Sequence, residues 1–540
     1  NLATNAIGVE TAGNGKLTFV DSTFANTKDV LITGSASVDF IEGTIDTTSA
    51  EVTGTGILNR MRHLDVTVTA DTNVIAGTKV VLKNGDGEPT GSGTTDSNGI
   101  ASDMTFTTET VDNSGLSVLS LAGYQAVTVA KVGSYYWNSA SDNAADFRYA
   151  FDNLSLTDAP GNSHSLALVE QVDVRLCYGF ALSSYPSMVP CPGQPTSSAR
   201  NYNSGLTQVG YYRAMPNNLQ DKVVMIDFGL AYLTGGQDYN FNGSTVLVTG
   251  SYQYDDSTRI QGLSPYETTL HAHNSEWISL AMDGDEPQGF QLGYEGRNWL
   301  VPNIENSTLS GVASIATNYG IKYSWSSYYN WEADFFNVRN STISHFRGNS
   351  LQGASTRVDE CMNSGVANTT IIDNIVKGCG TGIQFTRTAY SYYHTQAQWG
   401  ADGAIVHGND FIDTEFLDIW FYFAYADDVV VTENTFSGTT SPLYNVYTQS
   451  AYTTNITIND NTFNNNGDEP IYLRGAQGWT INGNTIYGDG DSSHPGIRVY
   501  RGFGTIDGNT LVDADGGIVV DGVTFNYEAN ITNNDISTSA

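Results

Sequence analysis

Basic residues are scarce in this chain of 540 residues. It carries 23 Lys and Arg against 57 Asp and Glu, which gives a formal net charge of −34. So acidic a surface repels the phosphate backbone, and we therefore exclude nucleic acid as a partner. The charge suits a secreted protein, or one that meets high salt or divalent cations.

Long apolar segments are also missing. No run approaches the roughly 18–20 residues of a membrane span, so we expect no transmembrane segment. No stretch shows the 3.6-residue period of an amphipathic helix. Hydrophobic residues make up 40% and charged residues 15%, a composition typical of a folded chain. The chain begins without Met or a signal peptide, and we expect it to have been processed or cut from a longer product.

Cysteine is rare, and none of the four cysteines has C-x-x-C spacing, which argues against zinc. Cys177 and Cys191 flank one short segment, and Cys361 and Cys379 flank another. We expect two local disulfides, which form in oxidising compartments. Four cysteines allow three pairings, and buried free thiols are the alternative.

The chain does contain a repeat, seen in TINDNTF (457–463), TINGNTI (480–486) and TIDGNTL (505–511). Aligned on the recurring asparagine, the intervals are 34, 34, 35, 25, 27, 23, 25 and 25 residues. A period of this size with short alternating strands predicts a solenoid. The recurring leucines of leucine-rich repeats are missing, so we predict a β-helix with one turn per repeat. The aligned residues are Asn306, Asn340, Asn374, Asn409, Asn434, Asn461, Asn484, Asn509 and Asn534.

Stacking explains why the asparagine recurs. Coils stack at about 4.8 Å, so nine aligned positions predict a rod segment of about 38 Å. An asparagine at a corner tolerates left-handed backbone geometry. Its amide can also bond to the asparagine of the next coil. We predict a structural ladder through Asn409, Asn434, Asn461, Asn484, Asn509 and Asn534.

Residues 276–540 resemble the right-handed parallel β-helix repeat family, and the three motifs carry this resemblance. The family has the pectin-lyase-like fold and includes polysaccharide-degrading enzymes and many secreted surface proteins. The resemblance implies the fold and says little about activity, because one fold serves many functions. Residues 1–65 repeat the pattern faintly in LTFVDSTF and VDFIEGTI, which predicts two or three N-terminal β-helix coils.

The segment 66–133 has a different character. GTKVVLKNGDGEP, TTDSNGIA and YQAVTVAKVG resemble the immunoglobulin-like modules of the carboxypeptidase-regulatory type. That resemblance implies an Ig-like β-sandwich inserted into the β-helix, a spacer or contact surface. Residues 134–275, with Cys177 and Cys191, predict irregular β-rich coils or a second small β domain. The predicted fold class is all-β: a right-handed parallel β-helix with an inserted sandwich.

The motifs of β-helix enzymes are incomplete. VHGND lacks the glycine before His407 that polygalacturonase-like enzymes have, and IRVYRG (497–502) is not Arg-x-Lys. Neither the acidic column with arginine of pectate-lyase-like enzymes nor the Asp-Pro-His-Glu of alginate epimerases is found. Asp427 and Asp428 would alternate faces on a strand and could not act together. We therefore predict no catalytic residues.

Acidic, glycine-rich turns are candidate calcium sites, because carboxylates two residues apart ligate calcium. This predicts calcium at Asp489, Asp491, Asp513 and Asp515; the alternative is a set of solvated turns. GDEP (467–470) is a similar turn. His271 and His273 would share a strand face near Glu276, a weaker metal candidate. Sequons give glycosylation candidates at Asn153, Asn242, Asn368, Asn455 and Asn530.

The aromatic stretch DIWFYFAYADD (418–428) has two interpretations. Exposed Tyr and Trp could stack on sugars or contact a protein. Alternatively, Trp420, Tyr422 and Ala424 fill the β-helix interior. A covering loop or a partner subunit would then lie over the other face, formed by Phe421, Phe423 and Tyr425.

No capping helix is visible at either end. A bare terminal coil exposes apolar side chains and strand edges, so we expect a longer natural chain or head-to-tail stacking of copies. We predict a non-enzymatic extracellular structural protein of a cell surface: an S-layer-like, filament or sheath subunit, or an adhesin. Its partners would be copies of itself, and glycans are further candidates. The alternatives are a secreted polysaccharide lyase or glycoside hydrolase, and a carbohydrate-binding surface protein.

Overall fold

The computed structural model describes most of the chain, and the residues outside the description fall in short segments. These are 1, 4–6, 14–15, 26, 35, 55, 88, 133–146, 178–199, 202–206, 209–216, 228–229, 234–237, 250–256, 263–267, 281–288, 293–299, 312–319, 324–335, 347–359, 387–400, 423–425, 439–442, 450–452, 465–468, 489–493, 515, 522–527 and 538–540.

The chain divides into two compact units. The first comprises residues 1–137 and 144–172, and the second comprises 138–143 and 173–540. The described residues contain β-strands, one 3-10 turn, η1 (Thr47–Ser49), and no α-helix. Among these residues no helix is long and apolar enough to cross a membrane.

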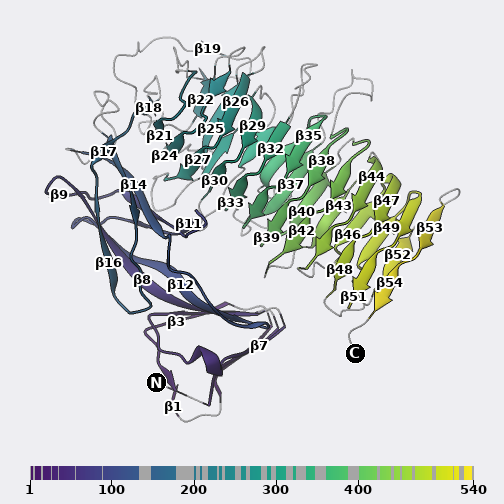
Figure 1. The fold of residues 1–540 in the computed structure, drawn as a ribbon, viewed down its shortest axis with the longest axis horizontal. Coiled ribbons are helices and arrows are strands. Elements are labelled where there is room, and N and C mark those ends of the chain that lie inside the picture. The colour runs from purple at the N-terminus through teal and green to yellow at the C-terminus, as the bar shows by residue number, and fades with distance from the viewer. Residues whose placement is uncertain are drawn as a thin grey trace. The chain divides into compact units, whose positions relative to one another are not determined.

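The second unit is built from three parallel sheets that wind around one core (Figure 1). Each complete coil contributes one strand to each sheet in a fixed order, first to the β23–β53 sheet, then to the 13-stranded sheet, then to the β22–β52 sheet; the coils at the two ends contribute fewer described strands. This is the parallel β-helix that the repeat predicts. Thirteen stacked strands correspond to a rod of about 58 Å at the usual inter-strand spacing.

The strands of the 13-stranded sheet are β18 (Val174–Cys177), β21 (Val223–Asp227), β24 (Thr245–Val248), β27 (Glu276–Ser279), β30 (Thr308–Ser310), β33 (Thr342–Ser344), β36 (Ile375–Lys377), β39 (Asp410–Ile412), β42 (Thr435–Ser437), β45 (Thr462–Phe463), β48 (Thr485–Tyr487), β51 (Thr510–Val512) and β54 (Asp535–Ser537). The β23–β53 sheet contains β23 (Tyr239–Asn240), β26 (Thr268–His273), β29 (Leu300–Glu305), β32 (Phe336–Arg339), β35 (Thr369–Ile372), β38 (Ile405–His407), β41 (Val430–Thr432), β44 (Thr454–Asn459), β47 (Gln477–Asn482), β50 (Gly504–Asp507) and β53 (Ala529–Thr532). The β22–β52 sheet contains β22 (Leu230–Leu233), β25 (Ser257–Gly262), β28 (Gly289–Leu292), β31 (Ile321–Tyr323), β34 (Glu360–Ser364), β37 (Thr381–Thr386), β40 (Leu417–Tyr422), β43 (Tyr444–Thr448), β46 (Ile471–Arg474), β49 (Ile497–Tyr500) and β52 (Ile518–Asp521). The pair β19 (Arg200–Asn201) and β20 (Thr207–Gln208) lies outside these sheets.

Equivalent apolar residues of successive coils stack inside the β-helix. The rings of Phe411, Phe436 and Phe463 lie with centroids 4.9 and 4.6 Å apart and planes within 11° of parallel. All three belong to one continuous buried cluster. The interior is thus a packed column, and its apolar burial is the main stabilising term of the fold.

The asparagine ladder runs along one corner of the β-helix. Each Nδ2 donates to the Oδ1 of the next asparagine, at 2.9, 2.9, 2.9, 3.0, 2.9 and 2.8 Å from Asn374 to Asn534. Each Oδ1 also accepts the backbone N–H of the preceding asparagine, for example Asn461 N to Asn484 Oδ1 at 3.0 Å. The ladder therefore satisfies backbone groups that the turn removes from the sheets.

Two aligned asparagines are not in the ladder. Ser307 and Ser341 occupy the ladder position in their coils, and Ser341 N donates to Asn374 Oδ1 at 2.9 Å. Asn306 and Asn340 precede these serines, are exposed, and have φ of 49° and 45°. The alignment that set them beside the ladder asparagines is therefore wrong by one residue in these two coils.

At every later corner, too, the residue with left-handed backbone geometry lies one position before the ladder residue. The left-handed residue is the one before the ladder asparagine, for example Asp460 with φ of 55° and Gly483 with φ of 67°. The asparagine itself is chosen for its hydrogen bonds, and the preceding residue provides the turn.

Cys361 and Cys379 form a disulfide with a Cα–Cα distance of 5.7 Å. Both lie in the buried core of the β-helix. Cys177 ends strand β18 and Cys191 lies outside the described residues, so their pairing stays a prediction.

The first unit contains two main sheets around a core of its own. The five-stranded sheet has the order β11 (Pro89–Thr94), β10 (Lys79–Lys83), β14 (Gln125–Lys131), β15 (Phe147–Asn153), β17 (Glu170–Gln171). The seven-stranded sheet has the order β13 (Gly115–Val118), β12 (Ile100–Asp112), β8 (Ile57–Ala70), β6 (Ser37–Ile41), β3 (Lys16–Val20), with β16 (Asn162–Ala167) and β9 (Asn73–Val74) paired to β8. Smaller sheets join β2 (Ile7–Gly13), β5 (Lys28–Gly34) and β7 (Glu51–Thr53), and β1 (Leu2–Ala3) and β4 (Phe24–Ala25).

The boundaries differ from those predicted at 65, 133 and 275. Strand β8 crosses the first boundary, pairing in parallel with β6 and antiparallel with β12. Strands β15 to β17 complete the two main sheets of the first unit beyond residue 133, and the β-helix begins at β18. The alignment on the recurring asparagine did not include these first coils, because Ser244 and Ser275 occupy the corner position there. The Ig-like assignment of this unit stays a prediction.

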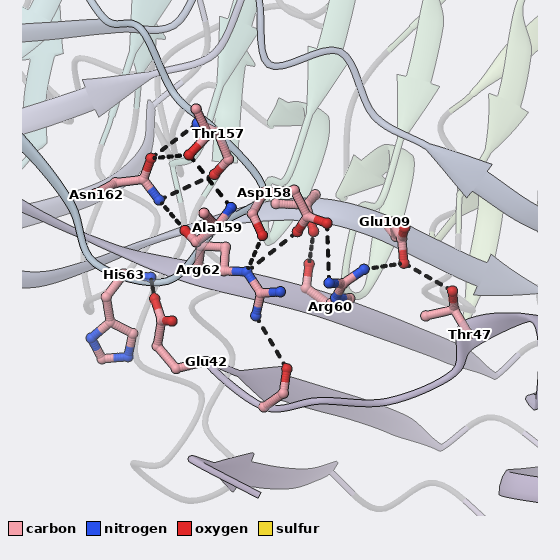
Figure 2. Close-up of polar contacts among 12 residues, drawn as sticks. Glu42, Thr47, Arg60, Arg62, His63, Glu109, Thr157, Asp158, Ala159 and Asn162 are labelled. Carbon is pink, nitrogen blue, oxygen red and sulfur yellow. Dashed lines mark hydrogen bonds and ion pairs between the residues drawn. The ribbon is translucent and has the colours of Figure 1, made fainter. Parts of the chain in front are cut away.

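Two arginines of strand β8, Arg60 and Arg62, form a cluster of ion pairs in the first unit (Figure 2). Arg60 contacts Glu109 and Asp158, each at 3.0 Å. Arg62, 3% exposed, contacts Asp158 at 3.3 Å and donates to the Gly43 carbonyl at 3.2 Å. Both guanidinium groups are paired, so we interpret this cluster as structural rather than as a binding site.

The last described coil exposes apolar side chains. Ile531 is 47% exposed and Ile536 is 51% exposed. Head-to-tail stacking of copies stays a prediction.

Candidate functional site

The two faces of the β22–β52 sheet carry different aromatic residues. Ile419 and Phe421 of β40 point into the core, where Phe421 stacks on Phe385 at 4.8 Å. Trp420 and Tyr422 alternate with them and belong to a separate cluster on the outer face. The interpretation that placed Trp420 and Tyr422 in the interior is therefore wrong. Residues 423–425 lie outside the description.

The aromatic residues on the outer side of the sheet form one packed cluster, which we call the aromatic strip; two of its five members, Trp420 and Tyr447, are buried and the other three are half-buried. It consists of Trp420, Tyr422, Tyr444, Tyr447 and Tyr472. Parallel pairing places Trp420, Tyr447 and Tyr472 in one column on the successive strands β40, β43 and β46, which lie side by side in Figure 1.

The rings of the strip touch one another. Tyr444 lies 4.6 Å from Tyr447 and 5.3 Å from Tyr472, and Tyr447 lies 5.4 Å from Tyr472. Trp420 and Tyr422 are 4.6 Å apart. Mutual packing fixes the orientation of these rings before any ligand arrives.

An arginine continues the same column. Arg498 of β49 pairs with Tyr472, and its guanidinium lies 5.6 Å from that ring. The guanidinium contacts the carboxylate of Glu469 and that of Asp521, the latter at 3.2 Å. Glu469 comes from the turn before β46 and Asp521 from the end of β52, so three coils build this group.

The charges of the strip shift the pKa values of its members. Partial burial opposes the charge on Arg498, but the carboxylates of Glu469 and Asp521 outweigh it and raise the pKa of the guanidinium. A hydrogen bond from Arg474 to Tyr447 raises the pKa of Arg474. Burial raises the pKa of the Tyr472 hydroxyl, with Arg474 and Arg498 opposing it. The strip therefore presents charged guanidinium groups beside the Tyr472 hydroxyl, whose raised pKa keeps it neutral at neutral pH.

Polar groups extend the column in the other direction. Gln384 pairs with Trp420, and Asn363 donates to Gln384 Oε1 at 2.6 Å. Trp420 is 7% exposed, and its buried Nε1 has no hydrogen-bond partner among the described residues. A buried N–H without an acceptor costs free energy, which a ligand hydroxyl could recover.

The predicted calcium residues are mostly outside the described chain. Asp489, Asp491 and Asp515 lie there, and Asp513 is described with φ of 54°. In the turn GDEP, Glu469 contacts Arg498. Among the described residues no group of three His, Cys, Asp or Glu is arranged to hold a metal ion. Calcium binding stays a prediction.

The two histidines share one face of β26, with ring centroids 5.8 Å apart. His271 Nδ1 lies 3.0 Å from Asn303 Nδ2, and burial lowers the pKa of His271.

The glycosylation candidates divide by exposure. Asn153, Asn368, Asn455 and Asn530 are exposed, and Asn242 is half-buried. The Nδ2 of Asn455 donates to Asp427 at 3.0 Å and to Asp428 at 3.2 Å. Glycosylation at these five residues stays a prediction.

Acidic residues also gather at the turns before β38 and β41. Asp427 and Asp428 share the Asn455 amide, so the prediction that they point to opposite faces is wrong; they lie in a turn and not on a strand. Burial raises the pKa of Asp402, and the charges of Asp427 and Asp428 add to this effect. Among the described residues no arginine or lysine contacts these three carboxylates, so no nearby cation offsets the effect of burial and of the neighbouring acids on the pKa of Asp402.

The fold can now be compared with known proteins. Residues 292–486 and 395–540 match the family model described as right handed beta helix region. This region is similar to the right-handed β-helix family. The match gives the hand of the winding, which agrees with the three parallel sheets of the structure.

Two solved structures resemble the β-helix protein. The crystal structure of Dettilon tailspike protein shares 16% identity over 59% of this chain and 62% of that chain, with a TM-score of 0.29. The Agl-KA catalytic domain shares 15% identity over 59% of this chain and 63% of that chain, with a TM-score of 0.25. The match spans about three fifths of each solved chain. No curated protein sequence matches this one.

Sequence reasoning found only part of the strip. The alternation in 418–428 singled out Trp420 and Tyr422, but Tyr444, Tyr447, Tyr472 and Arg498 come from three later coils. These residues line up when the repeats are aligned by strand pairing in the β22–β52 sheet. They do not line up when the repeats are aligned on the ladder asparagine.

Proposed function

We propose that this protein is an extracellular glycan-binding β-helix protein, and that the aromatic strip holds the sugar chain. The observation that carries the proposal is a column of packed aromatic rings on the outer face of a sheet, continued by hydrogen-bonding and charged groups. Aromatic faces bind the C–H faces of sugar rings, and the flanking polar groups bind their hydroxyls.

The length of the strip supports a polymeric ligand. The column from Asn363 to Arg498 crosses six strands, which corresponds to about 24 Å at the usual spacing. Its least buried members are Tyr472 and Arg498, so the sugar chain would contact the column chiefly at this end. The disulfide of Cys361 and Cys379 supports an extracellular location, because disulfides persist in oxidising compartments.

Binding is favoured over catalysis by the charges on the strip. The two carboxylates that contact Arg498 among the described residues, Glu469 and Asp521, are both engaged by that guanidinium. A glycosidase keeps one carboxyl group protonated as an acid and a second one free as nucleophile or base. A lyase or glycosidase remains the second candidate function, since the strip combines acids with an arginine.

Affinity electrophoresis in gels that contain soluble polysaccharides tests the proposal. We expect retardation by at least one polymer, and Tyr472→Ala should weaken it by about 0.5–1.5 kcal/mol, or about twofold to tenfold in Kd. Tyr487→Ala is the control, because Tyr487 is 43% exposed and lies on the 13-stranded sheet. Equal effects of both variants, or no retardation by any polymer, would overturn the proposal. Release of reducing ends or unsaturated products would establish the enzyme instead.

A further inference from the structure

Basic residues are distributed very unevenly in the last part of the β-helix. Residues 401–540 contain 19 Asp and Glu but three basic residues, Arg474, Arg498 and Arg501. All three belong to β46 and β49 or follow them directly, beside the aromatic strip. Acidic residues, in contrast, occur throughout the same region.

The three arginines surround two tyrosines of the outer face. Arg474 lies two residues after Tyr472 and pairs with Tyr500 of the next coil. The guanidinium of Arg501 lies 5.0 Å from the Tyr500 ring. Arg474 and Arg498 both act on the Tyr472 hydroxyl, so their charges lie close to the same ring.

Two of these arginines meet no carboxylate in the part of the chain that the structure describes. Arg498 contacts Glu469 and Asp521, but Arg474 bonds to the hydroxyl of Tyr447 and Arg501 lies over the Tyr500 ring. Neither Arg474 nor Arg501 contacts a carboxylate of the described residues, and both are exposed. In so acidic a chain, cations left beside aromatic rings are the exception.

We propose that the strip selects an anionic polysaccharide, with Arg474 and Arg501 binding its carboxylate or sulfate groups. The proposal rests on the proposed function and adds the charge of the ligand. A guanidinium binds carboxylate and sulfate through two parallel hydrogen bonds, and it remains charged at all physiological pH values. The overall charge of −34 repels a polyanion, so local positive groups are needed to hold one.

Matched pairs of polymers test the inference with the intact protein. The probes are polygalacturonate, alginate and chondroitin sulfate, each beside its carboxyl-reduced or desulfated product. We expect at least one acidic polymer to bind tenfold or more tightly than its neutralised product, with affinity falling as NaCl rises from 50 to 500 mM. Arg474→Gln and Arg501→Gln should each reduce that preference severalfold.

Arg339→Gln is the matched control, because Arg339 is exposed and lies on β32 of the β23–β53 sheet. It should leave the preference unchanged, and melting curves establish that all variants are folded. Equal binding of acidic and neutralised polymers would overturn the inference and leave glycan binding intact. Absence of binding to every polymer would overturn both.

Discussion

Replacing one rung of the asparagine ladder should destabilise the β-helix far more than replacing a surface asparagine. Asn484 is buried, and its Nδ2 donates to Ile458 O, Asn482 O and Asn509 Oδ1 at 2.8, 3.2 and 2.9 Å. Its Oδ1 accepts the backbone N–H and the side-chain amide of Asn461, both at 3.0 Å. Asn484→Ala removes all five hydrogen bonds.

The magnitude follows from the groups left behind. The Asn461 N–H loses its acceptor and the Ile458 carbonyl loses a donor, both in the buried corner. An unsatisfied buried backbone group costs about 1–3 kcal/mol, so we expect a loss of about 2–5 kcal/mol. Asn484→Asp should be at least as harmful at neutral pH, since a carboxylate cannot donate and would face the Asn509 Oδ1. Its folded-state pKa should rise, so stability should return as the pH falls and the acid becomes protonated.

Urea unfolding followed by tryptophan fluorescence measures the loss, and hydrogen exchange at the Asn461 amide locates it. Asn482→Ala is the control, because Asn482 lies in the same coil and points outward, half-buried. A loss for Asn484→Ala within about 0.5 kcal/mol of this control would refute the reasoning, since surface changes have effects of that size.

Two further predictions concern other parts of the molecule. Lys79 is 6% exposed, and burial lowers its pKa from 10.5 to about 8. Below pH 8 the folded state therefore bears a buried positive charge. Between pH 8 and 10.5 the unfolded state binds more protons than the folded state. Stability should therefore rise from pH 8 to pH 10.5. Lys79→Met should stabilise the first unit at pH 7 by up to about 3 kcal/mol, which calorimetry measures. A destabilised variant would contradict this account. Replacing Cys361 and Cys379 by Ala opens a disulfide across 18 residues and should lower the free energy of unfolding by about 3 kcal/mol. Reduction of the wild-type protein should have a similar effect, and unchanged stability in both cases would show that the cross-link does not restrain the unfolded chain.

Much of the fold could be predicted because the repeat acts locally. An apolar residue on each side of the corner and an asparagine within it recur in almost every coil after Asn374, so a single sequence reveals the period. The earlier coils could not be aligned in this way, because serine occupies the corner there, and the hydroxyls of Ser307 and Ser341 accept the backbone N–H of the preceding corner residue. The error at Asn306 and Asn340 has the same origin, since the turn residue was mistaken for the ladder residue.

The sequence by itself determined the all-β class, the β-helix, and the acidic character of the chain, because each depends on spacing or composition. Tertiary structure alone decided which residues meet on the outer face. Strand alternation allows either face of β40 to be the interior, and only packing against Phe385 assigns Phe421 inward and Trp420 outward. The loops between coils differ in length, so residues such as Trp420, Tyr447, Tyr472 and Arg498 have no fixed sequence interval. Stacking of the coils at one inter-strand distance brings them into a single column.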